Sequence, residues 1–584
     1  MNSETHSINS GQAKTCQNCK QSFVIYPEDK SFYQKINVPE PTHCSPCRSQ
    51  RRLVLRNERV LFKRSCSLCK KNIISMYSDD KPFPIHCPSC WYSDNWDPLS
   101  FGTDINLNRS FFEQFKALQD KVPRISLFNI NSVNSDYSNY SLDNKDCYFS
   151  FRLVGSERCH YVYYCIGSTD CINSLYLHKS ELVNDSFNVR NCHNCQNLVN
   201  CENCIDSAYS YDLRNCSYCL FCHNLRNKNY CLRNKQVSQE EFQRAWSEVV
   251  SGSRMKARDA KRMFNSLYKE KSIHRYNNII KCTNARGVDL INCKDVFEVY
   301  NGSDSENVRY SEDIETTKDS MDLKGPMESE LSYESCSIDN GCARIFFSNF
   351  CQRGCTDVYY SSFGINSSNL FGCISVRNSK HCILNKQYTP EEYNSLKEKI
   401  IENMTKAGEF GENFPIAMSP FAYNETVAVE YFPLVKEEVL KKGFVWQDKI
   451  GGTYGQETIS QDDLPDEIRN VSDSVINQIL KCEECGKNYR IVKDELDLYK
   501  RLSASLPEKC PHCRYYNLLR FRFPHRLWKT KCQCAGIASK NNVYKNGNQH
   551  SHGSASCSSE FETPYSPEGP EIVYCESCYN SEVV

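Results

Sequence analysis

The cysteines constrain the fold of this chain more than any other feature. The 584 residues include 37 cysteines, which form four blocks: eight in 16–90, twelve in 147–231, eight in 282–382 and nine in 482–578. The N-terminal residues lack the apolar core of a signal peptide, and no run of apolar residues is long enough to span a membrane. We therefore expect a cytoplasmic protein, in which C-x-x-C pairs hold metal more often than they form disulfides.

The first block has the spacing of two zinc sites. Zinc prefers four tetrahedral thiolate or imidazole ligands, and two C-x-x-C pairs supply four thiolates with no open coordination position. Such sites are structural rather than catalytic. The predicted ligands are Cys16, Cys19, Cys44 and Cys47 for one ion, and Cys66, Cys69, Cys87 and Cys90 for the next.

The last block repeats the first. Five of its cysteines each lie 466 residues after a cysteine of the first block, which indicates an internal duplication. The repeat predicts a third site from Cys482, Cys485, Cys510 and Cys513, and a fourth from Cys532, Cys534, Cys575 and Cys578. The fourth begins with a C-x-C pair, so Cys557 is kept as a substitute for one of its members, and His550 and His552 stay unassigned. About four structural zinc ions are expected.

The segment CQNCKQSFVIYPEDKSFYQKINVPEPTHCSPCRSQRR resembles the zinc-ribbon, treble-clef-like domain of bacteria. The whole chain resembles a group of uncharacterised multi-zinc-binding proteins from reduced-genome bacterial lineages. Some of these carry a CaiB/BaiF-type CoA-transferase label, which no residues here support. The resemblance implies zinc and a fold, and it implies no activity.

The middle blocks follow a different rule. Stepping by twelve residues from Cys147 reaches a cysteine, valine or serine each time up to Cys231. A fixed short period without helical spacing is typical of a β-solenoid, in which equivalent side chains stack from one turn to the next. Buried thiols suit a narrow interior. The alternative is further metal binding, because several of these cysteines also form C-x-x-C pairs.

A second internal repeat relates the two middle blocks, because CLRNKQVSQEEF at 231–242 matches CILNKQYTPEEY at 382–393. The predicted fold is mainly β with short helices: two β-solenoid-like repeat domains flanked at both ends by paired zinc-ribbon or treble-clef modules. The predicted domains are 1–98 (two zinc modules), 99–275 (first solenoid with capping helices), 276–407 (second solenoid with a C-terminal helix), 408–478 (partly ordered linker) and 479–584 (two zinc modules).

Arginines follow the second cysteine pair at both ends of the chain. Helical spacing places several of them on one face, where they can contact phosphates or compensate the negative charge of a four-thiolate zinc site. The candidates for nucleic-acid contact are Arg48, Arg51, Arg52, Arg56, Arg514 and Arg522. Both interpretations remain open at this point.

Composition and motifs limit the function. Lys plus Arg and Asp plus Glu both number 71, so the whole chain is not a basic polyelectrolyte. The sequence contains no H-E-x-x-H, no phosphate-binding loop and no dinucleotide fingerprint. We therefore expect a zinc-binding protein that is not an enzyme, with no membrane and no small-molecule substrate. A nucleic acid or ribonucleoprotein is the first candidate partner, and a protein bound by the solenoid surfaces is the alternative. A metal-dependent enzyme is the second alternative, although the sequence identifies no small-molecule substrate.

Overall fold

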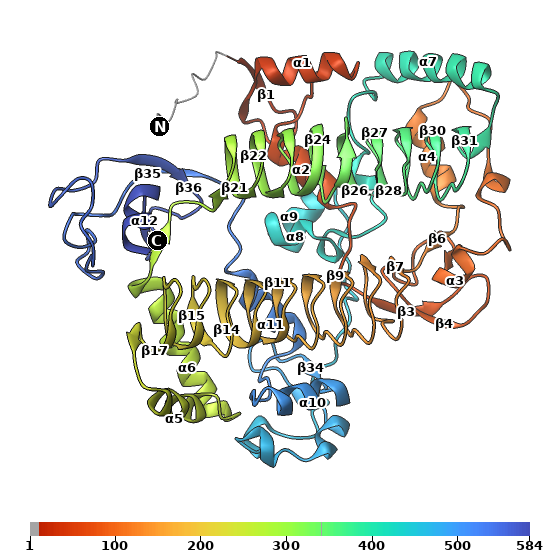
Figure 1. Ribbon diagram of the computed structural model, residues 1–584. Helices are drawn as coiled ribbons and strands as arrows, with labels where there is room; N and C mark the ends of the chain where they lie inside the picture. Colours follow the sequence, from red (N-terminus) through yellow and green to blue (C-terminus); the bar gives the residue numbers. More distant parts are fainter. Residues whose placement is uncertain (1–10, 340, 584) are drawn as a thin grey trace. The chain divides into compact units, whose positions relative to one another are not determined.

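The computed structural model describes residues 11–339 and 341–583 and is mainly β with short helices (Figure 1). The chain forms two compact units, and each combines segments that are distant in sequence. Unit 1 comprises the described residues up to Ser126 together with Asn278–Ile450, and unit 2 comprises Leu127–Asn277 together with the described residues from Gly451 onward. Among the described residues, no helix has both the length and the apolar character needed to cross a membrane.

Unit 2 contains a 12-stranded sheet, here called the first parallel stack. Apart from the last two strands, β17 and β18, which form an antiparallel pair, its strands pair in parallel with partners twelve residues further along, as Tyr163 does with Leu175 and Phe187 with Val199. The twelve-residue spacing of the cysteines equals this register. The strands are β7 (Asn129–Ile130), β8 (Ser141–Leu142), β9 (Phe151–Val154), β10 (Tyr163–Ile166), β11 (Leu175–His178), β12 (Glu181–Asn184), β13 (Phe187–Arg190), β14 (His193–Glu202), β15 (Ala208–Tyr211), β16 (Ser217–Leu220), β17 (Asn229–Leu232) and β18 (Lys235–Gln236).

A three-residue rule lies beneath the twelve-residue register. From β13 through β14 every third residue has a positive φ, including Asn188 at 53°, Asn191 in the intervening turn at 50° and Asn194 at 50°. Asparagine tolerates this left-handed conformation better than most residues. Because the direction of the backbone changes at each such residue, the chain returns beside itself after twelve residues.

The residue after each left-handed position points into the stack. Cys192, Cys195, Leu198, Cys201 and Cys204 are each at most 2% exposed. Thiol and hydroxyl groups at these positions accept hydrogen bonds from backbone N–H groups of the next turn. The Cys204 N–H donates to Cys192 Sγ at 3.3 Å, and the Cys192 N–H donates to Ser180 Oγ at 3.2 Å. Small side chains with an acceptor therefore fill the interior and satisfy buried donors.

This arrangement predicts the effect of replacing Cys192. Serine keeps the acceptor for the Cys204 N–H, so Cys192→Ser should cost less than about 1 kcal/mol of unfolding free energy. Valine fills the space but leaves that donor unsatisfied, so Cys192→Val should cost about 1–3 kcal/mol. Urea denaturation of both variants measures the difference, and a more stable valine variant would contradict the acceptor role.

Unit 1 contains the second parallel stack, a 13-stranded sheet with a less regular register. Partners are usually twelve residues apart, but Ala343 pairs with Thr356. The register also shifts between Arg286 and Gly287, where an added Cβ would lie 1.9 Å from the Val299 carbonyl oxygen. The strands are β20 (Ile279–Ile280), β21 (Thr283–Ile291), β22 (Lys294–Ser303), β23 (Glu306–Arg309), β24 (Glu312–Lys324), β25 (Met327–Glu330), β26 (Tyr333–Ile338), β27 (Ala343–Phe346), β28 (Asn349–Cys351), β29 (Thr356–Tyr359), β30 (Ser368–Phe371), β31 (Lys380–Ile383) and β32 (Lys386–Gln387).

The cysteine-rich modules share one local plan. An antiparallel hairpin carries the first cysteines in its turn, and a helix begins beside the second pair. Unit 1 has β1 (Gln12–Thr15), β2 (Ser22–Ile25), α1 (Pro27–Lys35) and α2 (Ser45–Leu53), then β3 (Phe62–Ser65), β4 (Asn72–Ser75), β5 (Ile85–His86) and α3 (Pro88–Trp91). Unit 2 has β33 (Leu480–Lys481), β34 (Asn488–Tyr489), α10 (Lys493–Arg501) and α11 (Pro511–Leu519), then β35 (Trp528–Lys531), β36 (Glu560–Thr563), β37 (Ile572–Tyr574) and α12 (Glu576–Val583).

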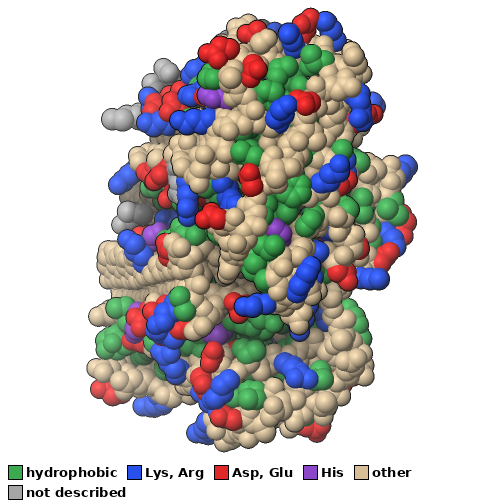
Figure 2. Space-filling view, turned by 90° about the vertical axis from the view of Figure 1, so that its right-hand side faces the viewer, with side chains coloured by type: hydrophobic (Ala, Val, Ile, Leu, Met, Phe, Trp, Pro, Cys, Tyr) green, Lys and Arg blue, Asp and Glu red, His purple; other side chains and the backbone are tan. Residues whose placement is uncertain are grey.

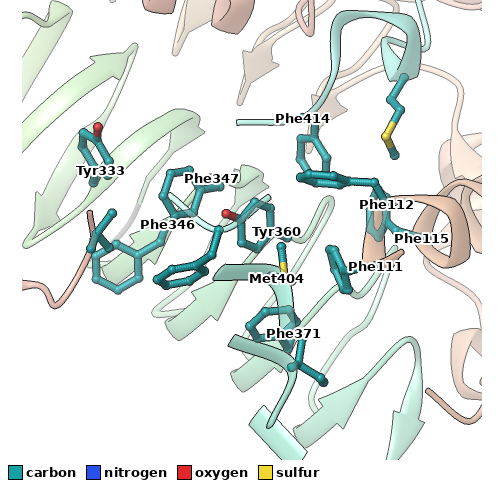
Figure 3. Close-up of a cluster of buried hydrophobic side chains, with 14 of the residues drawn as sticks. Phe111, Phe112, Phe115, Tyr333, Phe346, Phe347, Tyr360, Phe371, Met404 and Phe414 are labelled. Atoms are coloured by element: carbon teal, nitrogen blue, oxygen red, sulfur yellow. The ribbon is translucent and has the colours of Figure 1, made fainter. Parts of the chain in front are cut away.

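Helices and aromatic side chains cover the second parallel stack in unit 1. The helices α4 (Phe111–Gln119) and α7 (Pro390–Lys406) supply part of a large buried cluster. In Figure 3, Phe111, Phe112 and Phe115 of α4 lie close to Tyr360 and Phe371 of the stack region. The Phe111 and Phe371 rings meet edge to face at 5.2 Å, a favourable aromatic geometry.

The segment expected to be a linker, 408–478, is divided between the units. Its first part includes α8 (Ala428–Tyr431) and α9 (Lys436–Lys441), and it packs around Leu53 of α2 in unit 1. The part after Ile450 contributes Leu464, Ile468 and Val471 to a core cluster of unit 2.

The two units contain corresponding parts. In unit 1, β5 pairs in parallel with β6 (Arg124–Ile125), which follows α4. In unit 2, β37 pairs in parallel with β19 (Ile273–Arg275), which follows α6 (Arg254–Ser266). The first stack ends at α5 (Gln239–Val249), as the second ends at α7. The modules from the N-terminal end thus belong with the second stack, and those from the C-terminal end with the first.

A buried histidine of β19 gives unit 2 a pH dependence. Burial lowers the pKa of His274 to about 4, and its Nε2 lies 2.8 Å from the Tyr268 carbonyl oxygen. Between pH 6.5 and 4 the unfolded chain binds a proton that the folded chain does not, so the unfolding free energy should fall by about 3 kcal/mol as the pH drops through this window.

The matched measurement is urea denaturation at pH 7 and pH 4.5 for His274→Gln and for His193→Gln, whose side chain is half-exposed. The loss on acidification should shrink in the first variant and persist in the second. Burial also lowers the pKa of His160 and His223, so some loss should remain. Equal losses in both variants would contradict the role of His274.

Candidate metal centres

Four thiols converge in the first module of unit 1. The Sγ atoms of Cys16, Cys19, Cys44 and Cys47 all lie within 4.8 Å of one another. Cys19 Sγ and Cys44 Sγ are 3.6 Å apart, far beyond a disulfide bond but close to the separation of two thiolates that bind one zinc ion at about 2.3 Å. The Cys44 N–H donates to Cys16 Sγ at 3.3 Å and stabilises negative charge on it.

Two further modules repeat this geometry. Cys66, Cys69, Cys87 and Cys90 form one group, and Cys482, Cys485, Cys510 and Cys513 form another. The closest Sγ contacts between pairs are 3.9 Å for Cys69 with Cys87 and 3.7 Å for Cys485 with Cys510. In the first three modules the structure therefore brings together the four cysteines that the spacing predicted.

In two modules the backbone favours the thiolate form of the first cysteine, whereas the pKa values of other thiols in the same groups, such as Cys87 and Cys510, are raised by burial. Burial opposes the ionisation of Cys66, but N–H groups of Cys87 and Cys69 outweigh it and lower its pKa to about 6. The same balance lowers the pKa of Cys482 to about 7. Because zinc binds the thiolate form, a lowered pKa reduces the cost of removing the proton at neutral pH. All 37 cysteines are free of disulfide bonds.

The fourth module groups its ligands differently from the prediction. The four converging thiols are Cys532, Cys557, Cys575 and Cys578, so Cys557 takes the place that was assigned to Cys534. The hairpin explains this. Cys532 follows β35 directly and Cys557 lies three residues before β36, just as Cys66 follows β3 and Cys69 lies three residues before β4. A long insertion separates the two members of one cysteine pair.

Cys534 belongs to a second group in the same module. Its Sγ atom lies within 4.8 Å of ligand atoms of His550, His552 and Cys578. The sequence prediction left both histidines unassigned. The available signal was that three potential metal ligands, one cysteine and two histidines, occur in an insertion that the other three modules lack.

The cysteines of the parallel stacks form no such groups. Among residues 11–339 and 341–583, the five groups of the terminal modules are the ones with three or more suitable ligands in reach of one another. In the first stack, thiols such as Cys195 and Cys219 pack with Leu153, Leu177 and Val189 in one buried cluster. Burial also raises the pKa of the Cys201 thiol, which favours its neutral form.

The arginines predicted to contact phosphate in unit 1 are buried. Arg48, Arg51, Arg52 and Arg56 are at most 9% exposed. Asp322 of β24 lies 2.9 Å from Arg48 and 3.0 Å from Arg52, and Arg51 lies 2.7 Å from Glu412. Arg56 pairs with Glu58. These guanidinium groups compensate carboxylates of the second stack, of the segment after α7 and of their own module, and they have little surface left for a polyanion.

The corresponding arginine of unit 2, Arg514, is also engaged with neighbouring side chains of its own unit. Arg514 lies 3.1 Å from Glu495 and donates to Tyr499 at 2.7 Å, and its guanidinium group lies over the Tyr161 ring of the first stack region. Arg522 is half-buried. On the face shown in Figure 2, acidic and basic side chains are interspersed with one another.

No family model matches the chain, and no curated protein matches it either. The cysteine clusters of the terminal modules could hold metal ions and are consistent with zinc-binding modules. Functional conclusions therefore depend on the geometry of these centres.

Proposed function

We propose that the protein is a zinc-binding scaffold without catalytic activity, in which zinc ions stabilise four small modules and the modules support two β-solenoids that bind a partner. The observation that carries this proposal is the convergence of four thiols in each module. A site with four protein ligands leaves no position for a substrate or an activated water, which is the mark of a structural site.

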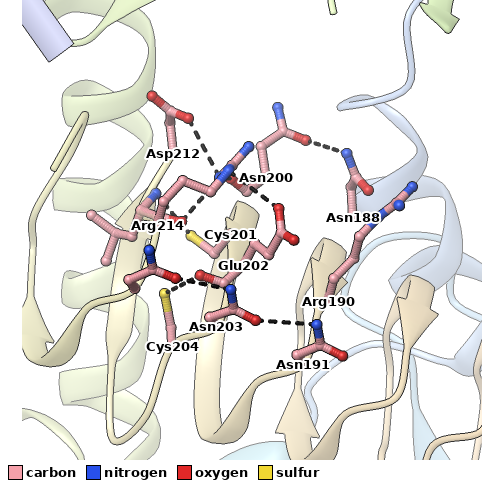
Figure 4. A network of polar contacts seen from close by, with 12 residues as sticks. Asn188, Arg190, Asn191, Asn200, Cys201, Glu202, Asn203, Cys204, Asp212 and Arg214 are labelled. Carbon is pink, nitrogen blue, oxygen red and sulfur yellow. Dashed lines mark hydrogen bonds and ion pairs between the residues drawn. The ribbon is translucent and has the colours of Figure 1, made fainter. Parts of the chain in front are cut away.

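The solenoid interpretation is supported by three features of the parallel stacks. Partners lie twelve residues apart, left-handed residues recur every three positions, and small inward-facing side chains line up between turns. Proteins with stacked repeats present extended surfaces for binding. In the first stack, exposed Asn191, Asn203, Asn215 and Asn227 form a hydrogen-bonded row, part of which is seen in Figure 4.

A protein partner fits this surface better than a nucleic acid does. The row of asparagines offers neutral donors and acceptors in a fixed spacing, and neutral polar side chains suit the polar rim of a protein interface. The arginines that favoured nucleic acid from sequence are engaged with Asp322, Glu412 and Glu58 in unit 1.

Two measurements test the proposal. Elemental analysis of the purified protein should give at least four zinc ions per chain, and fewer than three would contradict the ligand assignment. Affinity capture with nuclease treatment should retain a protein partner, and a variant with Asn203→Asp and Asn215→Asp should lose it. The matched control places the same change at Asn394, which is exposed on α7.

A second candidate, nucleic-acid binding, is favoured by one cavity of unit 2. This cavity of about 360 Å³ is lined in part by Arg254, Arg258, Lys261, Arg262, Lys509 and Arg520. Several of these cations are already paired, such as Arg258 with Glu508 at 2.7 Å. A gel-shift titration at 50 and 200 mM salt tests it: binding that weakens steeply with salt, and further in Lys261→Ala/Arg520→Ala but not in Lys399→Ala, would favour this function.

A further inference from the structure

The fourth module contains more metal ligands than one ion can use. The insertion between β35 and β36 carries Cys534, His550 and His552, and these residues converge with Cys578 of α12. We propose that this module binds two metal ions of the zinc class, which share the thiolate of Cys578. One ion takes Cys532, Cys557, Cys575 and Cys578, and the other takes Cys534, His550, His552 and Cys578. This inference rests on the proposed metal-binding role.

The distances are close to those of a second tetrahedral site. His550 Nδ1 lies 3.2 Å from Cys534 Sγ, and His552 Nε2 lies 3.2 Å from Cys578 Sγ. Ligands that bind one zinc ion at about 2.0–2.3 Å in a tetrahedron are separated by about 3.3–3.8 Å. Cys534 is 0% exposed and His550 is 4% exposed, so the site is closed from solvent on that side.

Both imidazole rings are oriented by partners on their outer nitrogens. His550 Nε2 lies 2.8 Å from Glu582 Oε1, and His552 Nδ1 lies 2.7 Å from the Ala555 carbonyl oxygen. An outer acceptor holds the proton on that nitrogen and leaves the other nitrogen free to bind metal, as is usual for histidine ligands. His550 would bind through Nδ1 and His552 through Nε2, and both of these nitrogens face the second group of ligands.

The ligand set also explains where Glu582 lies. Glu582 is four residues after Cys578 on α12, so one helical turn places the shared thiolate and the carboxylate on one face. The Glu582 side chain is 2% exposed and accepts hydrogen bonds from the Tyr544 hydroxyl and from the backbone N–H groups of Gly547 and Asn548. A metal-bound His550 adds a positively charged centre beside this buried carboxylate.

The formal charge of the module favours a second ion that shares one thiolate with the first. One zinc ion with four thiolates has a formal charge of about −2, whereas two zinc ions with the five thiolates and two neutral imidazoles of this module have about −1. The second ion therefore reduces the negative charge that must be buried in the cluster formed by these cysteines. It also gives the insertion a role that the other three modules do not need.

The test is the metal content of the full-length protein and of two variants. The wild type should hold five zinc ions per chain and His550→Gln/His552→Gln should hold four, while His193→Gln, outside the site, should hold five. Four ions in the wild type would overturn this inference but leave the proposed function intact. Fewer than three would overturn the proposed function itself, and five ions in the double variant would overturn the placement.

A second readout does not depend on whether the double variant folds. Wild-type protein loaded with ¹¹³Cd should show two resonances that are coupled to one another through the shared sulfur, one with four sulfur ligands and one with two sulfur and two nitrogen ligands. Resonances of four-sulfur sites alone, with no coupled pair, would overturn the inference.

Discussion

Removal of metal should unfold the terminal modules. The second module of unit 1, which contains α3, has a helix of four residues and short hairpin strands. Its apolar core is therefore too small to keep the module folded without the ion. Structural zinc sites contribute about 10 kcal/mol or more to the folding of small modules. We therefore expect a strong chelator to lower the melting temperature by tens of degrees, measured by circular dichroism and by the release of zinc.

A pair of cysteine variants separates ligand loss from thiol loss. Cys510→Ser removes one ligand of the third site, and Cys510 also packs with Leu496 and Tyr499 in a core cluster of unit 2. We expect it to release one zinc ion and to destabilise unit 2 by several kcal/mol. The control, Cys192→Ser in the first stack, should release none. Equal metal content in both variants, or an unchanged melting curve after chelation, would contradict the structural role of the metal.

The second large effect concerns Asp322, a carboxylate with 0% exposure that pairs with both Arg48 and Arg52. Asp322→Ala leaves two buried guanidinium groups that keep backbone acceptors but have the more distant Glu334 as their remaining shared ion-pair partner, at 3.5 Å from Arg48 and 3.7 Å from Arg52. Removing one partner of a buried ion pair costs about 3–5 kcal/mol, because the remaining charge is uncompensated.

Asp319 of the same strand provides the control. It lies 3.1 Å from Lys35 with about a third of its side chain exposed, so Asp319→Ala should cost at most about 1 kcal/mol. Urea denaturation of the two variants measures the difference. A loss in Asp322→Ala as small as that in Asp319→Ala would show that the arginines find other partners and that the ion pairs do not hold α2 on the second stack.

The cysteine spacing predicted three of the four thiol groups correctly. A C-x-x-C turn fixes two ligands by local geometry, so the sequence reports them directly. Cys557 was harder to assign, because the insertion separates it from Cys532 by 24 intervening residues. Only the pairing of β35 with β36 brings these two thiols together. The alternative kept for Cys557 was the part of the prediction that the structure supports.

The sequence also predicted only part of the pattern of the parallel stacks. The twelve-residue period was visible because cysteines mark it, but the three-residue rule was hidden among Cys, Ser, Leu and Val at inward positions and Asn, Asp and Tyr at left-handed ones. The pattern becomes clear from the structure, in which Ser180 and Cys192 are equivalent: each side chain accepts a hydrogen bond from a backbone N–H of the next turn.

The partners of the arginines could not be predicted from the sequence. Helical spacing predicted that Arg48, Arg52 and Arg56 share one helical face. The helix α2 ends at Leu53, so this holds for Arg48 and Arg52 but not for Arg56, although all three side chains are buried in unit 1. What that face meets depends on residues nearly three hundred positions away, such as Asp322 and Glu334. A local pattern contains no information about such a partner.

Short-range spacing was enough to predict the cysteine modules, their duplication and the repeat of the middle blocks. It was not enough to predict which modules pack on which stack. The N-terminal modules belong with the second stack and the C-terminal modules with the first. The physical reason is complementarity at long range: Arg48 meets Asp322 in unit 1, whereas its counterpart Arg514 meets Asn173 and the Tyr161 ring in unit 2.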